Sequence, residues 1–328
     1  MSPHDEIVAL TKALIRIPSV HSRPGEIGRC ADFIASWLDE RDIAYERREV
    51  DGTPSLIVLP EAGRIPVLYM AHFDVVEVAD EALFDPIEEK GCLYGRGAID
   101  DKYAVALSLV LFERHLGRLR ADGRGQADIG FGLLLTGDEE VGGANGAGAA
   151  FETLRPGFFI ALDGGGPKRI VTREKGIVQL NLEARGQAAH GARPWLGENA
   201  FDRLLADYAA IRRLFEDNES KDADDDHWHK TLVLSNCRAG DGSVNKVPDL
   251  ATATLDIRYT EADDPDELIR AIRAVVNHTQ VSVRAKVPLF VSGESAALDL
   301  LLETAGDAAT VSEHGASDAR YPSALGIP

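Results

Sequence analysis

Cysteine is scarce in this sequence. The 328 residues contain only three, Cys30, Cys92 and Cys237, and no two of them form a C-x-x-C pair. Three cysteines at such scattered positions are too few for a disulfide framework. Because thiols stay reduced in the cytoplasm, this composition fits a cytoplasmic protein, and we expect that location.

Positive charge is also in deficit: 35 lysines and arginines stand against 54 acidic residues, a formal net charge of −19. Such an excess of negative charge repels phosphate backbones and anionic membranes, so we expect neither nucleic acid nor a membrane as a partner. Long apolar runs are missing too. The run at 104–112 is far shorter than the roughly 20 residues that a membrane span requires. The N-terminus lacks the basic segment and apolar core of an export signal.

The remaining pattern is that of a globular protein with 45% apolar residues and enough length for two domains. In the first part of the chain, helix-like and strand-like segments alternate, which predicts an α/β fold. The turn-rich segment 117–128 is predicted to be an exposed connection. Apolar spacing predicts helices at 7–15, 25–41 and 104–112, and strands at 45–50, 55–59, 67–71, 129–136 and 158–162.

A second pattern begins after residue 175. Its predicted elements follow the order β-α-β-β-α-β, which is that of a two-layer sandwich of ferredoxin type. We therefore interpret 176–288 as an inserted domain, with a helix at 295–304 returning to the first domain. The predicted elements are strands at 177–184, 231–237, 250–259 and 281–287 and helices at 201–215 and 265–278.

Acidic residues or a histidine follow three of the predicted strands, and a glycine-rich turn before a helix adds two more acids. In an open α/β sheet the ligand crevice lies beyond the carboxyl ends of the strands. Acids that crowd there unpaired repel one another and lose solvation, and a divalent metal resolves this conflict. The residues are His72, Asp74, Asp100, Asp101, Glu139, Glu140 and Asp163.

Each of these residues has a plainer explanation when it is taken alone. His72 could be a satisfied core or surface histidine, and Asp100 and Asp101 could cap the following helix. Glu139 and Glu140 could lie in a solvated loop. The recurrence of such residues at several strand ends, each flanked by glycines, favours the metal site.

Four motifs also resemble, in order, those of the zinc amidohydrolase and exopeptidase family that includes acetylornithine deacetylase, succinyl-diaminopimelate desuccinylase, glutamate carboxypeptidase and bacterial dipeptidases. The resemblance implies a zinc-exopeptidase-like α/β catalytic domain, at 1–175 and 289–328, with an inserted ferredoxin-like lid at 176–288 that forms homodimers. The motifs are His72-x-Asp74, Gly95-Arg-Gly-Ala-x-Asp100-x-Lys102, Asp138-Glu139-Glu140-x-Gly142 and Asp163.

The resemblance implies two zinc ions, for which cobalt or manganese could substitute. It makes His72 and Asp163 ligands of one zinc, Glu140 a ligand of the other and Asp100 the bridge between them. Imidazole and carboxylate groups suit zinc, and a bridging carboxylate can hold two metals at the roughly 3.5 to 4 Å that lets both act on one oxygen. Asp74 would accept the other N–H of the His72 ring, although it could also be a turn residue.

Glu139 is expected to be the general base. A carboxylate that is not itself a ligand can take a proton from the activated water and give it to the leaving amine. The alternative for Glu139 is a contribution of negative charge alone.

In the inserted domain, the segment from Ala189 to Ala200 resembles a family motif whose histidine, here His190, reaches the partner subunit's active site and steadies the oxyanion. Taken alone, His190 would be a surface-loop histidine. Asn245 and Arg258 resemble the family's substrate-contacting residues. Arg258 could bind a substrate carboxylate through two hydrogen bonds, or could form a structural salt bridge on its strand.

Near the end of the chain, residues 314–320 resemble a substrate loop of the family, with His314 and Ala316 at positions where glycine and threonine are usual. This implies that Ser317 and Arg320 contact the substrate. Family members continue beyond the position of Pro328 and supply a last histidine ligand to the second zinc. We expect that the sequence is cut short or that this ligand is lost; in the second case the first zinc site should fill before the other.

These expectations favour a dizinc metallopeptidase that cleaves small peptides. Asp at the position of Asp163 is commoner among the family's dipeptidases and aminopeptidases, which gives a weak preference for a peptidase. The alternative is an N-acyl amino acid deacylase of acetylornithine deacetylase or succinyl-diaminopimelate desuccinylase type. A rival from another class is a relative without catalysis that binds or dimerises, but the ligands and the base are all present.

Overall fold

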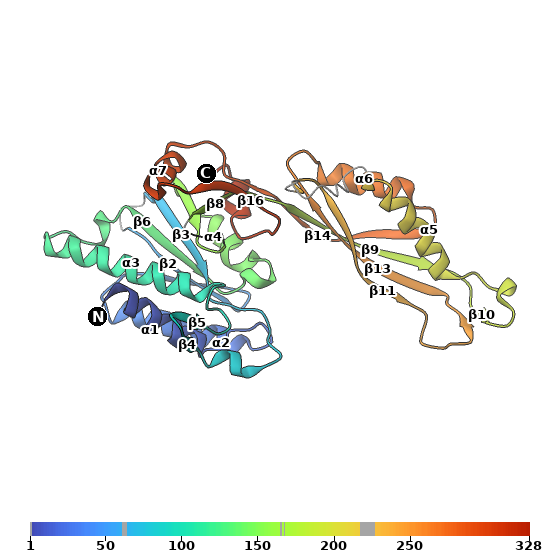
Figure 1. Cartoon of the computed structure of the whole chain (residues 1–328), viewed down its shortest axis with the longest axis horizontal. Helices are drawn as coiled ribbons and strands as arrows, with labels where there is room; N and C mark the ends of the chain where they lie inside the picture. The colour runs from blue at the N-terminus through green and yellow to red at the C-terminus, as the bar shows by residue number, and fades with distance from the viewer. Residues whose placement is uncertain (1, 61–63, 165, 167, 217–226) are drawn as a thin grey trace. The chain divides into compact units, whose positions relative to one another are not determined.

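The computed structural model describes residues 2–60, 64–164, 166, 168–216 and 227–328. It forms two compact units (Figure 1): the first consists of Met1–Val171, Ser292–Thr310 and Ser317–Pro328, and the second of Thr172–Val291 and Val311–Ala316. The chain passes from one unit to the other near the expected domain boundaries at 175/176 and 288/289. The short segment Val311–Ala316 also belongs to the second unit. The expected boundaries themselves stay a prediction.

A mixed five-stranded sheet forms the centre of the first unit, in the order β1-β2-β6-β3-β7. The three strands β6, β3 and β7 are parallel, and β2 runs antiparallel to both β1 and β6. The parallel strands therefore end at the same edge of the sheet. The strands are β1 (Glu46–Val50), β2 (Thr53–Val58), β3 (Val67–His72), β6 (Phe131–Thr136) and β7 (Phe158–Ala161).

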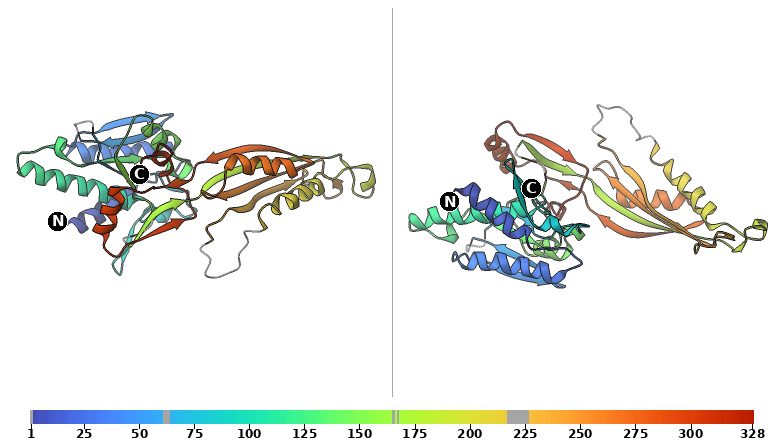
Figure 2. Two further views of the ribbon diagram at one scale, coloured as in Figure 1. Left: turned by 90° about the horizontal axis from the view of Figure 1, so that it is seen from above. Right: turned by 60° about the horizontal axis from the view of Figure 1, so that its bottom comes forward.

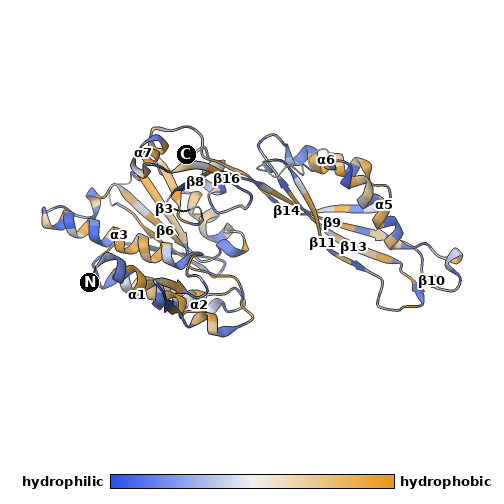
Figure 3. Ribbon diagram, viewed as in Figure 1, coloured by the Kyte–Doolittle hydropathy of each residue, from blue (hydrophilic) through white to orange (hydrophobic). Residues whose placement is uncertain are grey.

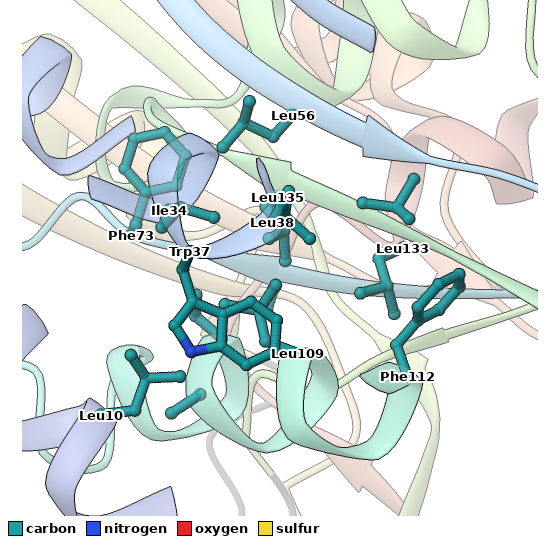
Figure 4. Packing of buried hydrophobic residues seen from close by; sticks show 14 of the residues in the cluster. Leu10, Ile34, Trp37, Leu38, Leu56, Phe73, Leu109, Phe112, Leu133 and Leu135 are labelled. Carbon is teal, nitrogen blue, oxygen red and sulfur yellow. The ribbon is translucent and has the colours of Figure 1, made fainter. Parts of the chain in front are cut away.

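Three helices share a hydrophobic core with one face of this sheet: α1 (Pro3–Ile15), α2 (Pro24–Asp39) and α3 (Lys102–Ala121). Helix α1 begins sharply because Ser2 and Asp5 form a capping box ahead of a proline in the first turn. Figure 3 shows apolar residues along β3, β6 and these helices. Figure 4 shows side chains of this core, among them Leu10, Ile34, Trp37, Leu38, Leu56, Leu109, Phe112, Leu133 and Leu135.

Helix α3 is longer than the sequence pattern suggested. The segment 117–128 was expected to be a connection, but its first five residues continue the helix to Ala121. The reason is that Leu116 and Leu119 are buried in the core, while Arg118 and Arg120 favour the helix C-terminus. Among the described residues, no helix is long and apolar enough to cross a bilayer.

Several short elements lie outside the two main sheets; of those that follow, β15 and parts of β8 and β16 belong to the second unit and the rest to the first. Strands β8 (Arg169–Glu174), β15 (Phe290–Val291) and β16 (Ala309–Glu313) form a three-stranded sheet that the sequence did not predict. Strands β4 (Ile87–Glu89) and β5 (Cys92–Tyr94) form a hairpin. The remaining elements are η1 (Glu81–Phe84), η2 (Gln126–Asp128), η3 (Glu139–Val141), η4 (Ala144–Gly148), α4 (Ala149–Phe151), α7 (Ala296–Ala305) and α8 (Arg320–Ala324).

The second unit contains an antiparallel four-stranded sheet in the order β11-β13-β9-β14. Alternate residues of β9 and β13 are buried against helices α5 and α6, which pack on one face of the sheet (Figure 2). The order of the elements is the one expected from the sequence. They are β9 (Gly176–Arg185), β10 (Ala189–His190), η5 (Pro194–Leu196), α5 (Ala200–Arg212), β11 (Thr231–Ala239), β12 (Lys246–Val247), β13 (Leu250–Tyr259), α6 (Pro265–Val275) and β14 (Thr279–Val287).

A buried carboxylate on α5 fixes the turn that joins α6 to β14. Asp207 is 2% exposed and accepts hydrogen bonds from the backbone N–H groups of Asn277, His278 and Thr279 at 3.0, 2.8 and 2.7 Å. The Thr279 hydroxyl donates a further bond at 2.8 Å. The carboxylate therefore satisfies backbone donors that would otherwise be buried without partners.

Replacing Asp207 by alanine should lower the free energy of unfolding of the second unit by about 2–3 kcal/mol, because buried N–H groups lose their acceptor. Urea unfolding followed by circular dichroism measures the change. Asp202→Ala is the matched control, since Asp202 lies exposed on the same helix. Equal effects of the two substitutions would contradict this role for Asp207.

Candidate metal centre

The three parallel strands of the first unit bring the predicted site residues to one edge of the sheet. Strand β3 ends at His72 between β6 and β7, which end just before Glu139 and Asp163. Asp100 lies in the turn that opens α3. The crevice beyond the carboxyl ends of parallel strands is the usual place for a ligand in such a sheet.

His72, Asp100 and Asp163 form a group whose ligand atoms all lie within 4.8 Å of one another. The Nε2 atom of His72 lies 3.1 Å from Asp100 Oδ1 and 3.8 Å from Asp163 Oδ2. The side chain of His72 is buried, and within the described parts of the chain its Nε2 has no hydrogen bond of good geometry. A buried imidazole nitrogen that faces two carboxylates in this way fits a divalent metal such as zinc.

Asp74 orients both His72 and the turn that carries the two glutamates. Its carboxylate is fully buried and accepts the backbone N–H groups of Glu139 at 3.2 Å and of Glu140 at 3.0 Å. The Nδ1 atom of His72 lies 3.1 Å from the carbonyl oxygen of Asp74 and 3.3 Å from its Oδ1. A proton on Nδ1 is therefore held by Asp74, which leaves Nε2 free to bind a metal.

A histidine that the sequence analysis did not single out completes the environment of Asp74. His21 Nε2 lies 3.0 Å from Asp74 Oδ2. Burial opposes ionisation of Asp74, but the hydrogen bonds from His21 and His72 outweigh it and lower the pKa of Asp74 to about 2. No local pattern around His21 indicates this contact, because it joins segments that are distant in the sequence.

The two glutamates have raised pKa values. Burial, with Asp318 nearby, raises the pKa of Glu139 to about 9. Burial and the neighbouring Asp100 raise the pKa of Glu140 to about 7, and Glu140 Oε1 accepts the N–H of Val76 at 3.1 Å. Both carboxyl groups therefore lack the positive charge that would stabilise their ionised forms.

The same imbalance is present at two further acids of the centre, whereas a hydrogen bond with His72 lowers the pKa of Asp100. Burial raises the pKa of Asp163 and raises the pKa of Asp101 well above its usual value. Although burial works against a charged imidazole, Asp100 and Asp74 raise the pKa of His72 well above 6.5. A divalent cation between these groups would relieve the repulsion and favour the carboxylate forms.

Asp101 and Lys102 support the centre from α3. Asp101 is the residue before the helix, but its side chain makes no capping bond. Its Oδ2 instead accepts the backbone N–H of His72 at 3.2 Å. Lys102 is fully buried and donates to the carbonyl oxygens of Leu14 at 2.9 Å and Ile17 at 2.6 Å, which ties the end of α1 to the start of α3.

The end of the chain adds residues to the same region. Ser317 and Asp318 line a small pocket together with His72, Glu139 and Asp163. Burial raises the pKa of Asp318 to about 7, and a side chain at Gly143 would collide with its Oδ1, at 1.9 Å from the position of a Cβ. The glycine is therefore needed for the approach of Asp318.

Arg320 is buried, and its guanidinium is bonded within the unit. It donates to the carbonyl oxygens of Ser317 at 2.6 Å and Gly142 at 2.7 Å, and to Asp318 Oδ1 at 3.2 Å. These bonds hold the Ser317–Asp318 turn against the loop that follows Glu140. Contact between Arg320 and the substrate stays a prediction.

The remaining predicted residues belong to the second unit. His190 is exposed on β10, which pairs with β12, and the N–H of Gly191 donates to the carbonyl oxygen of Asn245 at 2.6 Å. His190 and Asn245 therefore lie on adjoining segments. Arg258 is half-buried on β13 and donates through Nε to Asp256 Oδ1 at 2.8 Å, which is the structural salt bridge left open as an alternative.

The candidate metal ligands at the strand ends of an α/β unit, together with a four-stranded α+β unit inserted in the chain, indicate a two-domain metal-dependent enzyme. Residues 172–284 match the family described as "Peptidase dimerisation domain", which belongs to the M20 peptidases. The chain is 30% identical over 292 residues to succinyl-diaminopimelate desuccinylase of Alkalilimnicola ehrlichii, and the match covers 83% of this chain and 73% of that protein. The chain therefore belongs to the M20 family, as the motifs suggested.

Solved structures confirm the fold class. An M20 family metallo-carboxypeptidase from Sulfolobus solfataricus superposes with a TM-score of 0.77 at 17% identity, over 98% of this chain and 90% of that chain. The aminopeptidase PepT from Bacillus cereus superposes with a TM-score of 0.74 at 18% identity, over 99% and 88%. At these identities the likeness concerns the fold alone.

The chain spans less than two thirds of some curated relatives. It is 26% identical to a protein of Arthroderma gypseum described as "Probable carboxypeptidase", over 82% of this chain and 62% of that protein.

Replacing Glu139 by glutamine should make the metal-free protein more stable at pH 8 than the wild type, and the difference should shrink at pH 5. The pKa of Glu139 is about 9 in the fold against 4.5 for the free group. The folded state therefore holds a proton that the unfolded state releases, and stability falls as pH rises through this window, by at most about 1.4 kcal/mol per pH unit. Glutamine does not titrate.

Urea unfolding of both proteins in a metal chelator at the two pH values measures this difference. The exposed Glu303→Gln change on α7 serves as the control. A gain in stability that is the same at pH 5 and pH 8 would show that Glu139 does not carry the proton.

Proposed function

We propose that this protein is a dizinc metallopeptidase that hydrolyses the amide bond of small peptides. The observation that carries the proposal is the group of His72, Asp100 and Asp163 beside Glu139 in one pocket. Membership of the M20 family and the names of the relatives support it. Cobalt or manganese could replace zinc at such ligands.

In this proposal His72 and Asp163 would hold one zinc, Glu140 would hold the other and Asp100 would be shared by both. The metals would supply a nucleophile from water at neutral pH and would polarise the substrate carbonyl. Asp74 keeps the Nε2 of His72 directed at the metal position through the contacts to Nδ1. Burial and the neighbouring Asp100 raise the pKa of Glu140, and a cation between the two carboxylates would favour the ionised form of Glu140.

Glu139 is the proposed general base. It lines the same pocket as His72 and Asp163, so its carboxylate can reach a water molecule held there. Near a divalent cation its pKa would fall from the value in the metal-free chain, which makes the carboxylate available to take a proton. It then passes this proton to the departing amine.

A deacylase is the second candidate. The observation that favours it is the name of the relative with 30% identity, succinyl-diaminopimelate desuccinylase. Both candidates cleave an amide bond with the same metal ligands, so the substrate decides between them. Ser317 in the pocket, and Asn245 and Arg258 in the second unit, are the proposed substrate-binding residues together with Arg320.

Hydrolysis of dipeptides by the zinc-loaded protein should be lost in Glu139→Gln, by a factor of about 10² to 10⁴, because the general base is removed. The zinc content should stay unchanged, since Glu139 is not a proposed ligand. Parallel assays with acetylornithine and succinyl-diaminopimelate separate the peptidase from the deacylase. An active Glu139→Gln variant would rule out the role of Glu139, and a wild type that binds no zinc would rule out the function.

We also propose that the protein is a cytoplasmic homodimer that joins through the second unit. The match of 172–284 to a peptidase dimerisation domain supports the dimer. Strand β11 lies at an edge of the sheet, where unpaired backbone groups can accept a neighbouring strand. Two of the three cysteines are exposed as free thiols, which supports a reducing compartment.

A mixture of two inactive variants tests whether His190 acts on the partner subunit. His190→Ala and Glu139→Gln should each have low activity alone, and subunit exchange should restore about a quarter of the wild-type activity, because the mixed dimer contains one intact site. Light scattering at the assay concentration reports the oligomeric state. A monomer with full activity would exclude a role of His190 on a partner subunit.

A further inference from the structure

The segment between α1 and α2 is held by hydrogen bonds to the segment that follows β3. The hydroxyl of Ser19 donates to the carbonyl oxygen of Phe73 at 2.5 Å, and the N–H of Val75 donates to the carbonyl oxygen of Ser19 at 3.0 Å. Ser19 and Phe73 are both fully buried. These two bonds fix the position of 19–22 relative to 73–77.

The other end of the segment is held as well. Ser22 donates to Glu77 through its backbone N–H at 2.9 Å and through its hydroxyl at 3.0 Å. His21 lies between these attachment points, and its Nε2 reaches Asp74 Oδ2 at 3.0 Å. The ring of His21 is 29% exposed, whereas the carboxylate of Asp74 has no exposure. The backbone thus places this ring over the buried carboxylate.

His21 gives the Asp74 carboxylate a hydrogen-bond donor from outside the segments that follow β3 and β6. The other donors to the Asp74 carboxylate come from the strand ends themselves, namely the N–H groups of Glu139 and Glu140 and the Nδ1 of His72. Oδ2 is shared by His21 and the N–H of Glu140, each at 3.0 Å. Without His21, only the second of these bonds would hold Oδ2.

We propose that His21 is a positioning residue of the metal centre: it holds the Asp74 carboxylate in the rotamer that orients His72 and the Glu139–Glu140 turn. The inference rests on the proposed function, because it concerns the geometry that a metal would meet. His21 itself touches neither the ligand group nor the pocket that Glu139 lines. It acts only through Asp74.

The physical reason is the cost of a buried carboxylate that loses a charge-assisted donor. Asp74 would then turn towards its remaining donors or draw water to Oδ2. Either change alters the contact with the Nδ1 of His72 and the two N–H groups of the glutamate turn. Residues that orient metal-binding histidines in this way typically change metal affinity by about 10- to 100-fold when they are replaced.

The test is a titration of the metal-free full-length protein with Co²⁺ against a chromophoric chelator. His21→Leu, which removes the donor at similar volume, should weaken Co²⁺ binding by about 10- to 100-fold and change the visible absorption of the bound ion. His21→Gln should restore most of the affinity, because its side-chain amide can donate to Asp74 from a similar position. His115→Leu is the matched control, since His115 is half-buried on α3 beside Phe131.

His21→Asn provides a second comparison if the leucine variant does not fold. It keeps a polar side chain, but its amide ends closer to the backbone, so it should behave like leucine and unlike glutamine. Wild-type affinity and spectrum in His21→Leu, or in His21→Asn where the leucine variant does not fold, would overturn the inference, and so would equal losses in the glutamine variant, the donor-lacking variant and the control variant. If the wild type itself binds no Co²⁺ or Zn²⁺, the proposed function fails first and the role of His21 falls with it.

Discussion

The buried negative charge of Asp74 is the constraint on which the metal centre depends. A carboxylate with no exposure is stable only when donors surround it, and here the donors come from three separate segments: His21, His72 and the Glu139–Glu140 turn. Satisfying Asp74 therefore joins the loop after α1 to the ends of β3 and β6. The orientation of the ligand group follows from this requirement, because the same carboxylate fixes the His72 ring.

Around this anchor the centre contains more acids than cations. Burial raises the pKa values of Glu139, Glu140 and Asp163, and His72 is the imidazole that faces Asp100 and Asp163. Arg320, a cation of the same region, is already bonded to Asp318 and to two carbonyl oxygens. The fold thus holds acidic groups close together at a cost that metal binding would remove, which couples stability to metal content.

The strand ends and the order of the inserted unit could be predicted from the sequence because they follow from apolar periodicity. The strand at 67–71 ends at His72 as expected, and the β-α-β-β-α-β order is present in the second unit. The short sheet of β8, β15 and β16 was missed because β15 has only two residues, and β8 and β16 are mostly half-buried or exposed, so they lack the apolar run of a buried strand. Helix α3 extends beyond its expected end. The burial of Leu119 favours the helix more than the turn-forming residues around it oppose it.

Apart from Asp74, which its motif marks, the residues around the proposed ligands were harder to predict than the proposed ligands themselves. Asp100 and Asp163 stand next to strand ends or helix starts, where a local pattern marks them, and the family motifs repeat that information. His21, Asp101 and Asp318 act through contacts between segments that are far apart in the sequence. Such contacts depend on the three-dimensional path of the loops, which periodicity does not encode.

Proteins with the same metal ligands can differ in the residues around those ligands, and such differences can change the activity. A peptidase and a deacylase need the same metal geometry, so the ligands alone do not separate them. What can differ is the set of loop residues around the ligand group, such as the turn of Ser317, a proposed substrate contact, which Arg320 holds. Arg320 also donates to the carbonyl oxygen of Gly142, just beyond Glu140, so a substitution in that turn would also disturb the segment of Glu139 and Glu140, the proposed base and the proposed second metal ligand. In the proposed function, substrate preference and catalysis would therefore be coupled through one short segment of the first unit.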